Sequence, residues 1–330
     1  MPTTTSRPSL ARRSVLALAA TVLAAPAAFA AEPAFPNGPL RMVVGFAAGG
    51  GNDILARVIA KELQQRLGQS VVVENKPGAG GLIAGDIVSK APATGHTLLL
   101  GSMGAQTVAP SLMDKPPYNP RTGLAAVTMV ADSGNVLLIN SKLPFKNVKD
   151  VIAAAKQSPG KLSYESSGQG STLHLAGALF AQKAGVEMLH VPYKGNSQAI
   201  TDLSGGQVDM AFSGIPPALA SVRTGQTRML AVTTSQRLKS LPDVPTVAEV
   251  GLPGYEFSSW YGVLTTGGTP APVIAKLAAE IQAIVAKPEV REVFLQQGVE
   301  PFTSTPEAFQ KKINDELTRW AVDVKTLGII

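Results

Sequence analysis

Residues 40–53 read LRMVVGFAAGGGND, an apolar run that leads into a glycine-rich loop. The run, Leu40–Val44, is short and almost wholly apolar, as in a β-strand that is covered on both faces. Beyond the loop, apolar residues recur at helical spacing from Ile54 to Leu63, and Asn52 stands where a helix N-cap is expected. This strand, loop and helix form the repeating unit of an α/β fold.

The same alternation continues along the chain. Further apolar runs predict strands at 71–73, 98–100, 127–130, 136–139, 162–164, 188–191, 208–212 and 229–233. Helical patterns occupy 148–156, 172–183, 197–203, 274–286, 290–297 and 306–327. Strands that alternate with helices predict an α/β protein with mainly parallel sheets.

Two turn-rich stretches, near 131–134 and 251–254, indicate where the chain leaves a first unit and returns to it. Residues 31–132 and 253–330 would then form a discontinuous lobe I, and residues 133–252 would form an inserted lobe II. Two crossings between lobes make a hinge, and a cleft between hinged lobes is a common place to enclose a small ligand.

The first 30 residues have the features of an export signal. Arg12 and Arg13 precede an uncharged, largely apolar stretch that ends in Ala28-Phe29-Ala30, a small-x-small cleavage pattern. We therefore expect residues 1–30 to be a signal peptide that is cleaved near Ala30/Ala31, and the mature protein to reach the periplasm. The paired arginines also partly match a twin-arginine signal, so both export routes stay open.

The composition excludes several classes of protein. The chain has no cysteine, so we expect neither disulfides nor a lipid anchor on an N-terminal cysteine. Without the three arginines of the leader, the 29 basic residues fall to 26 against 23 acidic ones, a net charge of +3 without basic clusters. Nucleic-acid binding is therefore not expected, whereas a weakly positive surface fits a small anion. His96, His174 and His190 form no helical pair, so neither a metal nor another cofactor is predicted.

Donor-rich loops follow several predicted strands. Gly45–Asp53 brings backbone N–H groups to a helix start, which is typical of anion sites, although neither nucleotide fingerprint is complete and a tight turn is the alternative. Ser166–His174 adds hydroxyls at another helix start, which suits a carboxylate. In His190–Asn196, Lys194 would either balance an anion or face solvent. Pro77–Gly81 and Gly101–Gln106 would add further donors or, in the first case, only a turn.

A secreted serine hydrolase is the enzymatic alternative. It would use Ser167 or Ser171 as nucleophile with His174 as base, but the chain has no Gly-x-Ser-x-Gly elbow. His174 falls inside a predicted helix, where a packed histidine is the simpler interpretation. A periplasmic sensor that binds the same small anion and presents its loaded form to a signalling system is the second alternative.

Ordered motifs along the whole mature chain resemble one known family. They occupy 40–57, 72–81, 159–162, 166–177, 190–195, 202–209, 241–246, 251–255 and 259–262. In this order they are similar to the Bug-type solute receptors of tripartite tricarboxylate transporters. The resemblance implies a hinged, two-lobed type II periplasmic-binding fold. It also implies delivery of a di- or tricarboxylate, or an aromatic carboxylate, to a permease with one large and one small membrane subunit. We expect a monomer, since a two-lobed receptor needs no partner to form its cleft.

The resemblance also implies where the ligand is held. In the family, backbone amides, hydroxyls and ordered water bind the carboxylate, and Phe46–Asp53 and Ser166–Thr172 match segments that face it from opposite lobes. The family usually has prolines where this chain has Gly45-Phe46-Ala47-Ala48, so we expect a freer loop, with more N–H donors, that accepts a bulkier carboxylate. The predicted ligand contacts are Phe46, Ala47, Ala48, Gly49, Gly50, Asn52, Asp53, Gly78, Ala79, Ser102, Gly104, Gln106, Ser166, Ser167, Gly168, Ser171, Thr172, His174, Tyr193, Lys194, Gly195 and Asp209.

Overall fold

A computed structural model of the chain describes residues 3, 35–166, 168–169, 171–193 and 196–329. The predicted leader (Thr3 excepted), Ser167, Lys194 and Gly195 lie outside these residues. The chain divides into two compact units, 1–37 and 38–330, and the elements below all belong to the second. In the described part of the chain, none of the helices combines the length and the apolar character that a membrane span requires.

The first sheet has six strands in the order β11-β4-β10-β3-β1-β2. Its strands are β1 (Leu40–Val44), β2 (Val71–Asn75), β3 (Thr97–Ser102), β4 (Leu124–Gly134), β10 (Ser258–Thr266) and β11 (Glu300–Pro301). Only β1, β2 and β3 pair in parallel, because β10 runs antiparallel to both β3 and β4, and β11 runs antiparallel to β4. The prediction of mainly parallel strands is therefore wrong for the half of the sheet formed by β10, β4 and β11. Strand β4 is apolar because its side chains are buried, whatever the direction of its neighbours.

The second sheet has five strands in the order β7-β6-β8-β5-β9. Its strands are β5 (Val136–Asn140), β6 (Ser163–Ser166), β7 (Leu189–Pro192), β8 (Met210–Ser213) and β9 (Thr227–Val232). Here β6 pairs in parallel with β7 and β8, and β5 runs antiparallel to β8 and β9. Both sheets thus contain three parallel strands in the order second, first, third, extended on one side by antiparallel strands.

Helices pack against both sheets. They are α2 (Gly51–Leu67), η1 (Ala79–Gly81), α3 (Leu82–Ser89), the π-helix η2 (Gly104–Val108), α4 (Ala109–Ser111), α5 (Val148–Gln157), α6 (Thr172–Ala184), α7 (Asn196–Gly205), α8 (Ile215–Arg223), α9 (Ala271–Val285), α10 (Pro288–Gln296) and α11 (Pro306–Thr326). The sequence prediction missed α8, since Pro216-Pro217 is typical of a helix break. Proline is nevertheless tolerated at the first helical positions, where no N–H is needed.

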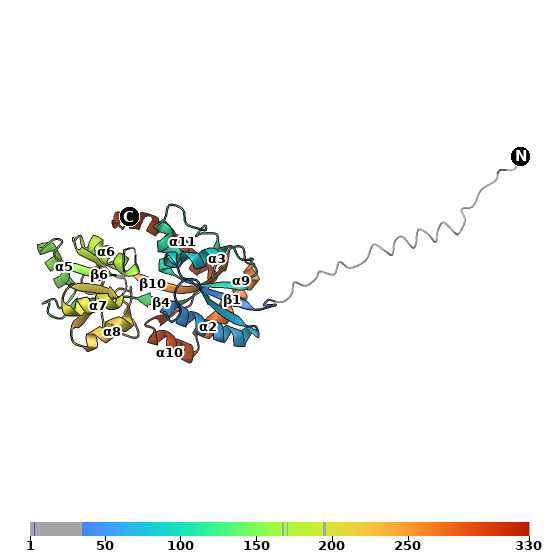
Figure 1. Ribbon diagram of the computed structural model, residues 1–330, viewed down its shortest axis with the longest axis horizontal. Coiled ribbons are helices and arrows are strands. Elements are labelled where there is room, and N and C mark those ends of the chain that lie inside the picture. Colours follow the sequence, from blue (N-terminus) through green and yellow to red (C-terminus); the bar gives the residue numbers. More distant parts are fainter. Residues whose placement is uncertain (1–2, 4–34, 167, 170, 194–195, 330) are drawn as a thin grey trace. The chain divides into compact units, whose positions relative to one another are not determined.

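The chain passes between the sheets at two neighbouring points. Asn135 separates β4 from β5, and its backbone N–H donates to Thr233 Oγ1 (2.9 Å) while its carbonyl accepts from the Thr233 N–H (2.8 Å). The second passage begins at Thr233, whose carbonyl accepts from the N–H of Phe257 (2.8 Å), next to β10. Figure 1 shows the elements of the second sheet on the far side of β4 and β10 from α2, α3 and α9.

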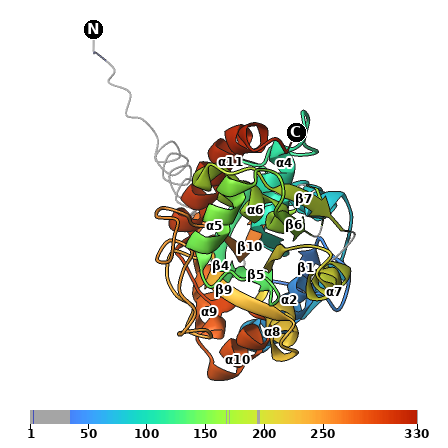
Figure 2. The same cartoon turned by 90° about the vertical axis from the view of Figure 1, so that its left-hand side faces the viewer.

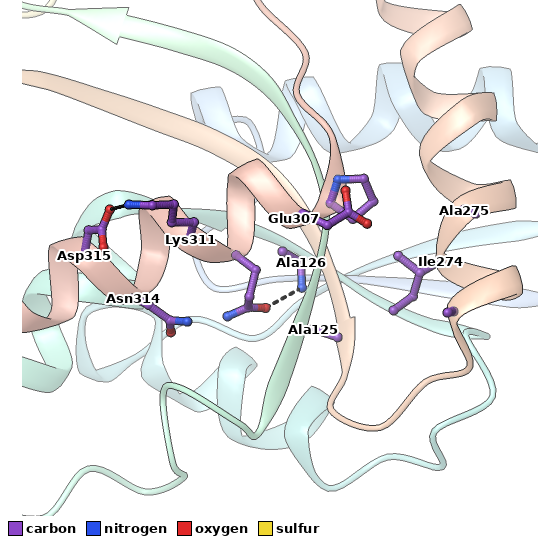
Figure 3. A pocket seen from close by; sticks show the side chains of 11 residues that line it. Ala125, Ala126, Ile274, Ala275, Glu307, Lys311, Asn314 and Asp315 are labelled. Atoms are coloured by element: carbon purple, nitrogen blue, oxygen red, sulfur yellow. Dashed lines mark hydrogen bonds and ion pairs between the residues drawn. The ribbon is translucent and has the colours of Figure 1, made fainter.

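A groove of about 630 Å³ opens between α9, α11 and the start of β4 (Figure 3). Its floor is apolar and includes Ala126 and Ile274, and its rim carries the charged pair Lys311 and Asp315. The groove contains none of the predicted ligand contacts.

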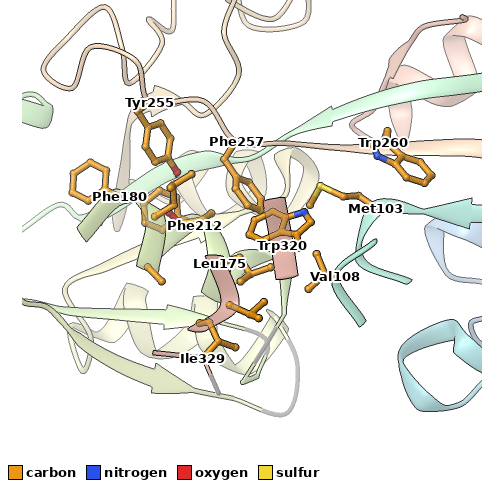
Figure 4. Packing of buried hydrophobic residues seen from close by; sticks show 14 of the residues in the cluster. Met103, Val108, Leu175, Phe180, Phe212, Tyr255, Phe257, Trp260, Trp320 and Ile329 are labelled. Carbon is orange, nitrogen blue, oxygen red and sulfur yellow. The ribbon is translucent and has the colours of Figure 1, made fainter. Parts of the chain in front are cut away.

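One apolar cluster continues from the first sheet into the second. On the second sheet α5 and α6 cover one face, and α7 and α8 cover the other (Figure 2). On the α6 side, the Phe180 ring packs edge-on against Tyr255, 5.9 Å between centroids, and Phe257 packs against Trp320 of α11 at 6.2 Å. Ile329, just after α11, belongs to the same cluster (Figure 4). The C-terminal end of the chain therefore packs against elements of both sheets.

Candidate functional site

Three loops meet where the parallel strands of the first sheet end. Because β1, β2 and β3 run in the same direction, the segments that follow them leave the same edge. A methyl group on Gly45, after β1, would lie only 2.8 Å from Cα of Gly81, after β2. One on Gly81 would lie 2.7 Å from Cβ of Ala105, after β3. We call this contact of Gly45, Gly81 and Ala105 the three-loop junction.

The second of these loops has a left-handed backbone over four consecutive residues. The φ angle is +136° at Gly78, +47° at Ala79, +64° at Gly80 and +96° at Gly81. Ala79 is the only residue other than glycine with positive φ in the described part of the chain. Such a conformation is unfavourable for alanine and persists where the surrounding structure enforces it, often at a binding site.

Asp53, a predicted ligand contact, holds the first loop together. Its carboxylate accepts hydrogen bonds from the Gly49 N–H (2.8 Å), Arg57 Nε (2.9 Å) and Asn75 Nδ2 (2.9 Å). Asn75 Nδ2 also donates to the carbonyl of Phe46 (3.0 Å). Burial alone would raise the pKa of Asp53, but the hydrogen bonds outweigh burial and lower this pKa to about 2. The Asp53 carboxylate is thus already hydrogen-bonded to groups of the protein and stabilises the loop.

We expect Asp53→Asn to lower the free energy of unfolding at pH 7 by about 2 kcal/mol, since each unit of pKa shift corresponds to about 1.4 kcal/mol. The pKa of Asp53 in the folded protein, about 2, lies below its ordinary value of 3.8. The carboxylate therefore stabilises the fold fully above about pH 4, and this contribution is lost as the pH falls towards 2. Urea unfolding at pH 7 and pH 2.5 measures it. The control is Asp315→Asn, which breaks an exposed pair with Lys311. An Asp53→Asn deficit of equal size at both pH values would contradict the assignment.

Asn52 does not cap α2, contrary to the sequence prediction. Gly50 occupies the N-cap position with extended backbone, and no side chain caps the helix. The amide nitrogen of Asn52 is instead buried and has no hydrogen-bond partner among the described residues. The first turn of α2 consequently offers free backbone N–H groups together with a side-chain donor.

The loop after β6 repeats this arrangement on the second sheet. Ser171 is the N-cap of α6, and its Oγ accepts the N–H of His174 (3.2 Å), as its place at a helix start predicts. The Gly168 N–H donates to Ser166 Oγ (3.1 Å), which closes the turn before the helix. Tyr193 joins this loop through its backbone, because its N–H donates to the carbonyl of Ser166 (2.9 Å).

The side chain of Tyr193 is directed to α7. Its hydroxyl donates to Asp202 Oδ2 (2.8 Å). Burial and the neighbouring Asp202 carboxylate raise the pKa of Tyr193 to about 12. The hydroxyl of Tyr193 therefore stays protonated and is already hydrogen-bonded within the protein.

Two histidines lie against this loop. His174 is 5% exposed within α6, as the packed-histidine interpretation predicted, and its ring stacks on that of His190 with centroids 3.7 Å apart and planes 4° apart. Burial and the adjacent His190 ring lower the pKa of His174 to about 4, and burial lowers the pKa of His190. Both rings are therefore neutral at pH 7.

Among the described residues the structure gives no support to a serine nucleophile, and the other candidate, Ser167, lies outside them. The hydroxyl of Ser171 meets the backbone of His174 as a cap. The Ser–His contact that does occur, Ser166 Oγ to His190 Nε2 at 2.7 Å, was not predicted. Ser166 is fully buried, and its oxygen also accepts the Gly168 N–H, so it cannot reach an ester or amide.

Glu165 is a buried acid that the sequence pattern did not indicate. It is 0% exposed in β6, and neither carboxylate oxygen has a hydrogen-bond partner among the described residues. The strand register aligns it with Val191 and Ala211, which belong to the apolar cluster beneath α7 and α8. Burial raises the pKa of Glu165 to about 8, so the group is mostly protonated at pH 7. The predicted strand stopped at Tyr164 because the next residue, Glu165, is charged and does not continue an apolar run.

Two predicted contacts are corrected by their positions. Asp209 precedes β8 and accepts from the N–H and Oγ of Ser163 at the start of β6, both at 2.8 Å. It therefore lies at the amino edge of the sheet, opposite the edge with the donor-rich loops. Gln106 is 3% exposed and accepts from the hydroxyl of Tyr118 (2.8 Å), so it supports packing.

The donor-rich edges of the two sheets approach each other. A methyl group on Gly104, after β3, would lie 3.3 Å from Cγ2 of Thr172 at the start of α6. Ser102 ends β3, and Asn135, at the passage between the sheets, is 6% exposed with its amide nitrogen lacking a partner among the described residues. Asn135 was not predicted, since only the fold brings it to this edge.

Each sheet also has a topological switch point at this edge. In the first sheet the chain runs from β1 outwards to β2 and then back to β3, and in the second from β6 to β7 and back to β8. In open α/β sheets, ligands bind outside the carboxyl ends of the strands at such a reversal. The loops after β1, β3 and β6 are the ones that carry most of the predicted contacts.

The fold and the paired switch points define a two-lobed solute-binding protein of the periplasmic type. A family model described as "Tripartite tricarboxylate transporter family receptor" matches residues 55–329, and the chain belongs to this family. The family consists of transport receptors that bind solutes and are not enzymes.

Individual relatives agree with this assignment. The chain is similar to BugT of Bordetella pertussis, with 39% identity over 295 residues that cover 89% of this chain and 90% of BugT. It is also similar to Rpa4515 of R. palustris, solved with adipate, at 36% identity and a TM-score of 0.75 over 89% of this chain and 98% of that chain. MatC from Rhodopseudomonas palustris, solved with bound malate, is 31% identical with a TM-score of 0.71 over 88% of this chain and all of that chain.

Proposed function

We propose that this protein captures a small dicarboxylate between its lobes in the periplasm and delivers it, as a monomer, to the large and small membrane subunits of a tripartite tricarboxylate-type transporter. Residues 1–30 act as the signal peptide, lobe I comprises 31–132 and 253–330, and lobe II comprises 133–252. The observation that carries the proposal is the approach of Gly104 to Thr172, which sets donor-rich loops of the two lobes side by side.

Neutral donors hold the carboxylates in this proposal. Arg57, in the helix that follows the first loop, is already paired with Asp53, whereas the amide nitrogens of Asn52 and Asn135 have no acceptor among the described residues. A buried donor without an acceptor is unfavourable, so an anion that supplies acceptors there is bound more strongly than its neutral analogue. The backbone of Phe46–Gly50 and of Gly78-Ala79 supplies further N–H groups from lobe I.

Two similar structures support a dicarboxylate over a monocarboxylate. Adipate and malate, the molecules held by Rpa4515 and MatC, both carry two carboxylates. A ligand with two anionic ends lets each lobe hold one end, which couples binding to closure of the lobes. The freer Gly45–Ala48 loop is proposed to admit a bulkier member of this class.

A thermal-shift screen of the processed protein tests the proposal. The panel contains mono-, di- and tricarboxylates, aromatic acids and the matching neutral amides, with calorimetry on each hit. At about 100 times the Kd, binding adds roughly 2.7 kcal/mol to the stability, which is a readily measured shift. We expect dicarboxylates to raise the melting temperature, their diamides not to, and the ligand to be recovered unchanged.

Two variants locate the binding site. Gly104→Val, whose side chain would meet Thr172, should abolish the shift, and Gly205→Ala, which faces open space, should keep it. A shift that survives in Gly104→Val would place the ligand elsewhere, and a chemically altered ligand would indicate an enzyme.

A further inference from the structure

Ser166 Oγ takes part in three hydrogen-bonding contacts but has only one hydrogen to donate. It accepts from the Gly168 N–H (3.1 Å), lies 3.0 Å from the Gly168 carbonyl and lies 2.7 Å from His190 Nε2. If the hydroxyl donates to the Gly168 carbonyl, the contact with His190 is satisfied only when Nε2 carries a hydrogen and donates it. This network therefore assigns the Nε2–H form to His190.

We infer that His190 is a positioning residue of the ligand site, which acts by holding Ser166 and thereby the loop that enters α6. The inference rests on the proposed function, because that loop carries Gly168, Ser171 and Thr172 of the proposed lobe II contacts. The end of β7 is fixed to the same point, since the N–H of Tyr193 donates to the Ser166 carbonyl (2.9 Å).

The stack with His174 makes this arrangement sensitive to charge. His174 lies in the first turn of α6, so the stacked rings join the helix start to β7. Protonation of His190 keeps the Nε2–H, but it places a positive charge 3.7 Å from a second imidazole. Two protonated rings repel each other at this distance, and the contact between α6 and β7 weakens.

Few other charges face the pair. The rings border a groove of about 700 Å³, and among the described residues that line it the remaining titratable groups are Tyr164 and Glu187. The Tyr164 ring lies 5.1 Å from that of His190, and its pKa is raised by burial, so it stays neutral. Glu165 follows Tyr164 in the strand and faces the opposite side of the sheet. Glu187 is thus the one carboxylate among the described residues that line this groove.

Hydrogen exchange of the backbone amides of 168–174 in the ligand-free processed protein tests the positioning role. His190→Phe keeps a ring on His174 but removes the donor, and His190→Gln restores a donor without the ring. We expect about ten-fold faster exchange in His190→Phe, which is the size of one lost hydrogen bond, and near wild-type exchange in His190→Gln. Ser166→Ala should reproduce His190→Phe, and the double variant should be no faster than either single one.

The pH profile separates positioning from general destabilisation. As the pH falls from 7.5 to 4, exchange of this loop relative to the lobe I loop at 45–50 should increase in the wild type, because the lowered pKa values leave both rings neutral at pH 7.5 and His174 gains its charge only near pH 4. The increase should be absent in His190→Phe. Wild-type exchange in His190→Phe, or effects of His190→Phe and Ser166→Ala that add, would overturn the inference. The exchange needs no ligand, so its outcome does not depend on the success of the carboxylate screen.

Discussion

Replacement of Gly45 by alanine should lower the melting temperature by roughly 5–10 °C and abolish carboxylate binding, because overpacking by one methyl group costs about 2–3 kcal/mol where nothing can yield. The added Cβ would lie 2.8 Å from Cα and 3.0 Å from the carbonyl oxygen of Gly81. Both are backbone atoms, so relief requires a shift of the whole loop after β2. That shift also displaces Gly78 and Ala79, which are proposed ligand contacts.

Gly51→Ala is the matched control. Gly51 begins α2, six positions along the same segment, and a methyl group there meets nothing within 4 Å. We expect Gly51→Ala to melt at or slightly above the wild-type temperature and to bind normally, since alanine favours a helix. Differential scanning calorimetry, with and without the best ligand of the screen, compares the two variants. Wild-type melting and binding in Gly45→Ala would show that the three loops do not approach as closely as described.

The three-loop junction also explains why the departure from the family's proline-rich loop is structural as well as local. A proline at position 45 has a Cβ atom too, so it would meet Gly81 in the same way as alanine. The glycine at 45 and the left-handed glycine at 81 are therefore features of one packing arrangement.

The sequence predicts the individual strand and helix units of the fold well, but it predicts poorly which strands pair and in which direction. In the unit β1–α2 the strand is predicted to the residue and the start of the helix within two residues, because the apolar pattern and the glycine loop are local signals. Strand β10 was not predicted as a strand, although its Trp-Tyr motif was noted, because its partners β3 and β4 lie more than a hundred residues away in the chain. Direction of pairing depends on such distant partners, so the antiparallel pairing of β4, β5 and β9 was not predicted although these strands were.

The site residues divide in the same way. Helix starts and glycine loops were located from sequence, and Ser171, predicted as a ligand contact at such a start, is the N-cap of α6. Asp209 and Gln106 were misjudged because their hydrogen-bond partners, Ser163 and Tyr118, are joined to them only by the tertiary structure. In the sequence, Asn135 is a polar residue between two predicted strands, and only the tertiary structure shows that its amide is buried where the chain passes between the sheets.

Glu165→Gln should remove a stability loss of about 2 kcal/mol that the wild-type protein undergoes between pH 6.5 and 8.5, as linkage predicts. Burial raises the pKa of Glu165 from its ordinary 4.5 to about 8, so the folded protein holds this proton more tightly than the unfolded chain. The stabilisation is complete below about pH 4.5 and is lost as the pH rises through 8. Glutamine resembles the protonated acid and has no proton to lose, so the variant should be insensitive to pH in this interval and more stable than the wild type at pH 8.5.

Comparison of the two proteins isolates Glu165 from the stacked histidines. His174 and His190 have lowered pKa values in the folded protein, so their contribution to stability decreases as the pH falls through about 6.5, but both proteins keep them and this contribution cancels in the difference. Urea unfolding midpoints at pH 6.5, 7.5 and 8.5 therefore report on the buried carboxyl, and Glu187→Gln, an exposed residue of the same lobe, serves as the control. Parallel pH profiles for the wild type and Glu165→Gln would mean that a cation or a donor meets Glu165 in solution. In that case the carboxylate is ionised at pH 7, and Glu165→Gln should be less stable than the wild type throughout.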